Sequence, residues 1–132
     1  MKKQKPNQAT DKCGCEVESI VFLPCSGGSN CGQLANQTAI ELTDAGMGNI
    51  YCLAGLGAHI EGMVNSVKMA DKIVVIDGCA TACARKVLEH LSIPVSHYIC
   101  ITELGITKNH DFNLVADDIT LVTNYVEKLL SK

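Results

Sequence analysis

Short apolar runs alternate with longer amphipathic segments along this chain from about residue 20 onward. The runs are continuous and short, which is typical of strands buried on both faces. Between them, apolar residues recur at intervals of about three to four, which predicts helices. The predicted strands cover residues 20–23, 50–53, 73–76 and 98–101, and the predicted helices cover residues 31–45, 60–67, 80–91 and 115–129.

Strands that alternate with helices predict a parallel sheet whose right-handed crossovers place helices on both faces. We therefore expect a small α/β protein with a flavodoxin- or Rossmann-like three-layer α/β/α arrangement and about four strands in the order 2-1-3-4. Residues 1–18 are polar and lack periodicity. We expect them to form a flexible N-terminal tail, followed by a single α/β domain over residues 19–132.

Composition narrows the classes of function. Hydrophobic residues make up 47% of the 132 residues, which argues against a largely disordered chain. The net charge of −3 gives no basic footprint for nucleic acid, and no apolar stretch reaches the length of a membrane span, so neither partner is expected. The N-terminal residues contain no apolar signal core, and we expect a cytoplasmic protein. The oligomeric state stays open.

Eight cysteines are the most distinctive feature of the composition. In a reducing cytoplasm, clustered cysteines are more often metal ligands or catalytic thiols than structural disulfides. Four of them, the edge cysteines, follow the predicted strands: Cys25 follows the first, Cys52 ends the second, Cys79 follows the third, and Cys83 lies one helical turn further on. Because binding sites of such sheets lie beyond the carboxyl ends of the strands, we expect these thiols at one edge.

Four thiolates at one edge predict a bound metal ion, with zinc favoured, because zinc takes four tetrahedral ligands and accepts thiolates readily. Cys79 and Cys83 are spaced to face one ion, and a helix N-terminus favours the ionised thiol. Cys31 near the start of the first predicted helix and His110 after the fourth predicted strand are further candidate ligands.

Several other residues near this edge have two interpretations. Asp77 ends a predicted strand and could orient a ligand, although capping the next helix is the more common role. His59 is expected at the same edge of the sheet and is a candidate for a hydrogen bond that orients one of the metal ligands. Cys100 lies inside an apolar run and is expected in the core. Cys13 and Cys15 form an isolated C-x-C in the polar tail, which alone is a weak metal motif.

Four short motifs stand out along the chain: Pro-Cys-Ser-Gly-Gly-Ser-Asn at 24–30, Cys-Leu-Ala-Gly-Leu-Gly at 52–57, Asp-Gly-Cys at 77–79 with Cys-Ala-Arg-Lys at 83–86, and the segment 104–112. In combination, these motifs resemble the DGC-domain family, whose members are described as zinc-binding proteins. The resemblance covers residues 20–130 and implies that the four edge cysteines are zinc ligands, whereas the position of Cys31 need not be cysteine. It implies no particular reaction.

Three functions fit these residues. The first is a protein that holds, stores or senses zinc, which suits a closed four-thiolate site. The second is a thiol-based redox or sulfur- or metalloid-handling enzyme, with Cys25 as nucleophile and Cys79 with Cys83 as a redox pair. The third is an iron–sulfur protein, since four cysteines also hold a cluster.

Overall fold

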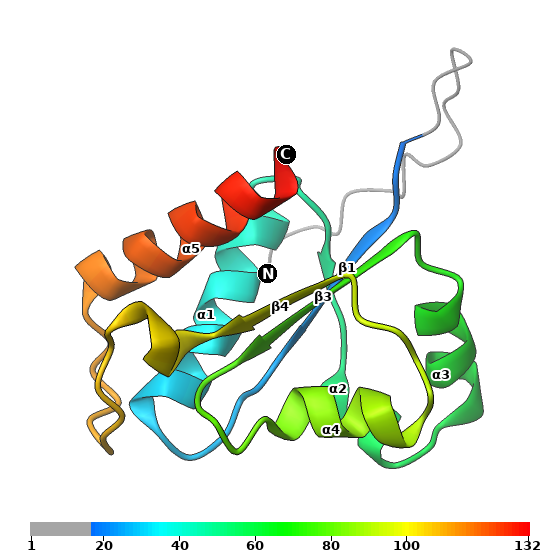
Figure 1. Ribbon diagram of the computed structural model, residues 1–132, viewed down its shortest axis with the longest axis horizontal. Helices are drawn as coiled ribbons and strands as arrows, with labels where there is room; N and C mark the ends of the chain where they lie inside the picture. Colours follow the sequence, from blue (N-terminus) through cyan, green and yellow to red (C-terminus); the bar gives the residue numbers. More distant parts are fainter. Residues whose placement is uncertain (1–16) are drawn as a thin grey trace, which may run out of the picture.

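The computed structural model describes residues 17–132, so the predicted tail lies almost entirely outside the described residues. Four parallel strands form one sheet in the order β2-β1-β3-β4 (Figure 1), which confirms the predicted order. The elements are β1 (Ile20–Pro24), α1 (Asn30–Asp44), β2 (Asn49–Ile50), α2 (Leu53–Gly57), α3 (Glu61–Lys68), β3 (Lys72–Asp77), α4 (Cys83–His90), β4 (His97–Cys100), the 3-10 helix η2 (Ile101–Leu104) and α5 (Ala116–Leu130).

The sheet separates two apolar cores, because successive side chains of a strand point to opposite faces. Figure 1 shows α1 and α5 on one face and α2, α3 and α4 on the other. Phe22 of β1 belongs to the core under α1 and α5, where it joins Leu34 and Val126. The next residue, Leu23, belongs to the opposite core with Leu88 of α4. The three-layer α/β/α arrangement expected from the sequence is therefore confirmed.

The segment after the second strand differs from the prediction. A strand was expected over residues 50–53 with a loop after it, but β2 ends at Ile50 and α2 begins at Leu53. β2 is an edge strand that pairs with β1 over only two residue pairs, so little holds the chain in the sheet. Leu53 and Leu56, three residues apart, instead pack into the core under α2, α3 and α4. A short apolar run fits either a strand or a helix, and here the packing of Leu53 and Leu56 in the core favours the helix.

Parallel strands end at the same edge of the sheet, which we call the carboxyl edge. The chain leaves β1 through a loop into α1, β2 through a two-residue turn into α2, and β3 through a loop into α4. Cys25, Cys52 and Cys79 lie in these three connections, and Cys83 is the first residue of α4. None of the described helices combines the length and apolar character that crossing a bilayer requires.

Candidate functional site

The loop after β1 holds Cys25 against the end of β3. The backbone N–H of Cys25 donates to Ile76 O (2.8 Å), and its Sγ accepts from Gly27 N (3.4 Å). Burial raises the pKa of the Cys25 thiol, and the nearby Asp77 and Cys83 raise it further against the Gly27 bond. The surroundings of Cys25 therefore favour the protonated thiol over the thiolate.

Glycine at position 78 lets the loop after β3 pack directly on the first turn of α1. A Cβ added to Gly78 would lie 2.7 Å from both Cys31 C and Gly32 N, which leaves no room for a side chain. This packing encloses Cys31, which is 0% exposed. Burial raises the pKa of the Cys31 thiol, and the neighbouring Cys79 adds to the rise. Cys31 thus belongs to the core under α1 and α5, and its thiol is not at the surface.

Cys79 has surroundings that favour its thiolate. Its thiol donates to Thr81 Oγ1 (3.4 Å), and Lys108 Nζ donates to its Sγ (3.4 Å). Hydrogen bonds with Thr81 lower the pKa of the Cys79 thiol, burial opposes this effect in part, and the Lys108 ammonium lowers the pKa further. The Thr81 hydroxyl can rotate to donate once the thiol has ionised. Because Cys79 also remains partly exposed, reagents and metal ions can reach it.

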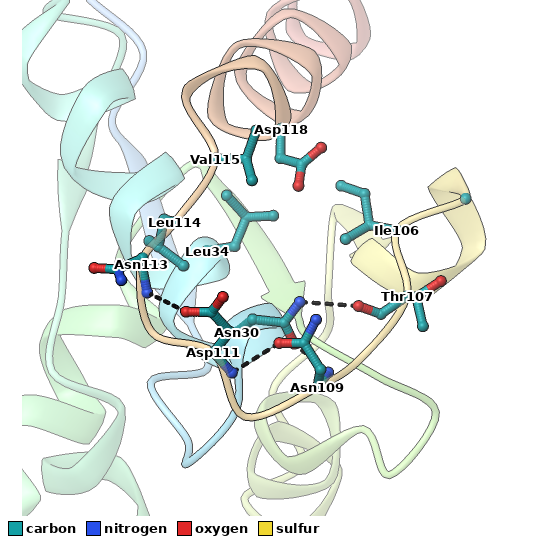
Figure 2. A pocket seen from close by; sticks show the side chains of 11 residues that line it. Asn30, Leu34, Ile106, Thr107, Asn109, Asp111, Asn113, Leu114, Val115 and Asp118 are labelled. Carbon is teal, nitrogen blue, oxygen red and sulfur yellow. Dashed lines mark hydrogen bonds between the residues drawn. The ribbon is translucent and has the colours of Figure 1, made fainter.

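Lys108 reaches Cys79 because Asn30, the first residue of α1, fixes the segment 107–109. Asn30 Nδ2 donates to Thr107 O (2.9 Å), a bond that Figure 2 shows. Asn109 N donates to Asn30 Oδ1 (2.6 Å), and Asn30 N donates to Asn109 O (3.0 Å). Asn30 therefore donates two hydrogen bonds and accepts one, and the three together hold the backbone on both sides of Lys108.

A pocket of about 290 Å³ lies beside this segment, with Thr107 and Asn109 in its lining (Figure 2). Leu34 and Ile106 give it apolar walls, and Asp118 points toward it from the first turn of α5. Asp111 and Asn109 line the opposite side, where Asp111 N donates to Asn109 Oδ1 (2.8 Å). None of the described cysteines lines this pocket, so the thiols form a separate site.

Asp77 caps α4 and so fixes the backbone that carries the exposed Cys83. The Asp77 carboxylate, 1% exposed, accepts from Ala84 N (2.9 Å) and Arg85 N (3.0 Å). Tyr98 Oη also donates to it (3.1 Å). Burial, followed by the negative charge of Asp77, raises the pKa of the Tyr98 hydroxyl above its usual range. Of the two roles considered for Asp77, the hydrogen bonds show the capping role.

Cys52 and His59 flank α2. Cys52 is exposed, and its Sγ accepts from Gly55 N (3.4 Å), so it caps the helix. The ring of His59 lies next to that of His90, with centroids 5.0 Å apart. Sequence reasoning left His90 without a role, since nothing in the spacing of the two histidines predicts their contact.

The remaining predicted residues lie apart from these groups. Cys100 is buried at the end of β4, as expected, with its Sγ 3.4 Å from Thr102 Oγ1. His110 is exposed in the connection between η2 and α5. Cys13 and Cys15 lie outside the described residues.

The edge cysteines do not form a closed cluster of ligands. The charge of Cys83 contributes to the raised pKa of Cys25, and those of Cys79 and Cys100 contribute to the raised pKa of the buried Cys31. Within residues 17–132, no group of three or more His, Cys, Asp or Glu side chains is arranged to hold a metal ion. All six described cysteines are free thiols. Zinc binding therefore stays a prediction.

Sequence reasoning missed Thr81, Lys108 and Tyr98. Lys108 lies 29 residues from Cys79 and reaches it only through the folded connection after η2, so no local spacing could have indicated it. The position of Thr81 could have been noticed in the sequence, because a hydroxyl two residues after a cysteine can reach its sulfur. Tyr98 lies on β4, the neighbour of β3, and only the strand order brings it near Asp77.

The chain is thus a small parallel α/β protein with free thiols at its carboxyl edge and an Asp-Gly-Cys segment at the end of β3 whose aspartate caps α4. It belongs to the DGC domain family, whose family model matches residues 21–126. Among characterised proteins, it is 32% identical over 108 residues to the "Anaerobic and virulence modulator AnvM" of Pseudomonas aeruginosa. That match covers 81% of this chain and 82% of AnvM. No solved structure matches the chain.

Proposed function

We propose that this DGC domain protein binds one zinc ion through thiolates at the carboxyl edge of the sheet. The observation that carries the proposal is that the connections after β1, β2 and β3 each bring a free thiol to this edge, and the start of α4 adds a fourth. Free thiols are kept reduced in the cytoplasm, where we expect the protein to act. The ligands would be Cys25, Cys52, Cys79 and Cys83.

Zinc would draw these thiols together from their positions in the free protein. Cys52 and Cys83 are exposed at the beginnings of α2 and α4, so their side chains can turn without disturbing either core. Cys79 is already biased toward the thiolate that zinc requires, and the ion would displace the Lys108 ammonium from its sulfur. Four thiolates leave no open coordination position, which suits a structural or sensing role better than catalysis.

Elemental analysis of anaerobically purified protein, with thiol titration before and after chelation, tests this proposal. We expect one zinc per chain and four thiols that become reactive when the ion is removed. Cys79→Ser should weaken zinc binding by at least about tenfold, since it removes a ligand. Cys100→Ser, a change at a buried cysteine outside the proposed set, is the matched control and should retain the ion. Unchanged zinc stoichiometry and affinity in the Cys79→Ser variant would refute the four-thiolate site. Visible absorption bands in the freshly purified protein would indicate an iron–sulfur cluster in place of zinc.

A second candidate function is thiol chemistry at Cys79, favoured by the contact with Lys108 and by the lowered pKa of this thiol. A thiolate is the form of cysteine that reacts with oxidants and electrophiles. The relative AnvM is named as an anaerobic and virulence modulator, and a thiolate that changes state with oxygen supply would suit a modulator of that kind.

The rate of iodoacetamide modification at Cys79 as a function of pH tests this second function. Lys108→Met should move the inflection of the rate profile to higher pH, because the variant lacks the positive charge beside the sulfur. Lys86→Met, which changes an exposed lysine on α4, serves as the control. If zinc-loaded and metal-free protein react at the same rate, Cys79 is not a zinc ligand and the thiol function is favoured. Strong protection by zinc favours the metal site.

A further inference from the structure

A second hollow, of about 230 Å³, lies between α2 and α4 on the face of the sheet opposite α1 and α5. The apolar side chains of Leu56 and Val87 line it together with the imidazoles of His59 and His90. We propose that His59 and His90 form a metal-binding site of their own, which takes one divalent transition-metal ion of the zinc, nickel and copper class. Neutral imidazole is a preferred ligand of all three ions.

The separation of the two rings matches joint ligation of one ion. Their centroids are 5.0 Å apart and their planes meet at 72°. Two imidazoles that bind one zinc at about 2.1 Å with a tetrahedral angle between them have centroids about 5 Å apart. The two rings therefore already lie at the separation that a shared ion requires.

The backbone on both sides holds the rings in place. His59 has a left-handed φ of 59°, which is uncommon for a residue with a side chain, and its N–H donates to Leu56 O (3.0 Å). This conformation turns the chain directly after α2 and keeps His59 beside α4. His90 is the last residue of α4, where the negative end of the helix dipole favours a cation.

Two other residues of the hollow define what kind of site this is. Cys83 precedes His90 by seven residues on the same helix, a rise of about 10.5 Å, so the two cannot share one ion. This agrees with the finding that the described residues contain no group of three or more potential ligands. Lys86 is exposed, and its long stem can extend the ammonium into solvent. Two imidazoles and water thus make an open, exchangeable site, distinct from the proposed thiolate site.

Zinc titration of histidine-labelled protein, followed by NMR of the ring nitrogens, tests the site directly. The chain has four histidines, so His97 and His110 act as internal controls in the same sample. We expect the rings of His59 and His90 to respond together with one binding curve and to show the nitrogen shift of a metal-bound imidazole. His97 and His110 should not follow that curve.

Three variants separate ligation from indirect effects. His90→Gln should remove the response of His59 and weaken binding at least about tenfold, because one ligand can no longer act with the other. His59→Asn, which tolerates the left-handed backbone, should do the same to His90. His110→Gln is the matched surface control. Cys83→Ser should leave both histidine responses intact, so failure of the thiolate proposal would not affect this one. Independent responses of the two rings, or their loss in the Cys83 variant, would overturn the proposal.

Discussion

Replacement of Asp77 by alanine should destabilise the protein by about 2–3 kcal/mol. Asp77 is 1% exposed and accepts from Ala84 N, Arg85 N and Tyr98 Oη. Loss of a helix cap costs about 1–2 kcal/mol, and a hydroxyl left without its partner costs about 1 kcal/mol more. Asp77→Asn should cost less, because the amide oxygen can still accept from one backbone N–H of α4.

Urea denaturation of the metal-free protein measures this cost as a change in the free energy of unfolding at constant m-value. Tyr98→Phe alone should cost about 1 kcal/mol, since it removes one hydrogen bond to the carboxylate. In the Asp77→Ala background the same change should cost almost nothing, because the acceptor is already absent. Additive effects of the two substitutions would refute the hydrogen bond between Tyr98 and Asp77. A cost of Asp77→Ala below about 0.5 kcal/mol would refute the assignment of Asp77 as the cap of α4.

Three further changes test the packing, the titration and the metal. Gly78→Ala should destabilise the protein by about 1–3 kcal/mol in urea denaturation, because the new Cβ would lie 2.7 Å from the backbone of Cys31 and Gly32. Gly57→Ala is the control and should be neutral or slightly stabilising, because its Cβ would have no other atom within 4 Å. The pKa of Tyr98 is raised in the folded protein, so the neutral hydroxyl contributes fully to the free energy of unfolding below about pH 10, the pKa of tyrosine in the unfolded chain. That contribution is lost as the pH rises further. Tyr98→Phe should therefore flatten the fall in stability at alkaline pH. A chelator should lower the melting temperature of zinc-loaded protein and leave a cooperative transition in calorimetry, because both apolar cores remain.

The sheet was predictable because its strands carry a strong local signal. Residues 73–76 are four consecutive apolar residues, and all four are buried in β3, the strand that pairs with two neighbours. The alternation of strands and helices predicts a parallel sheet, but it leaves the order of the strands open; the order 2-1-3-4 rests on the flavodoxin-like arrangement alone. The turn into α2 was not predictable, because Leu53 and Leu56 fit either element and only the edge position of β2 decides between them.

The candidate site was predictable in its location and less so in its chemistry. The edge cysteines could be placed after strand ends from sequence alone, since every strand of a parallel sheet ends at the same edge. Their electrostatic environments could not, because those depend on residues far away in sequence. Lys108 acts on Cys79 across 29 positions, and Asn30 sets its place through bonds to the segment 107–109. The contact between His59 and His90 is equally non-local, since it depends on how α2 packs beside α4.

The edge cysteines are not equivalent, and this difference separates the two candidate functions. Burial and the nearby Asp77 raise the pKa of Cys25, while Thr81 and Lys108 lower that of Cys79. A four-thiolate zinc site must deprotonate both, so its affinity depends on the proton that Cys25 loses and falls as pH decreases. Thiol chemistry needs only Cys79, and its rate follows the pKa of that residue alone. Cys25→Ser should therefore abolish tight zinc binding and leave the alkylation rate of Cys79 in the metal-free protein unchanged. If the Cys25→Ser variant still bound zinc tightly, the ligand set could not include Cys25.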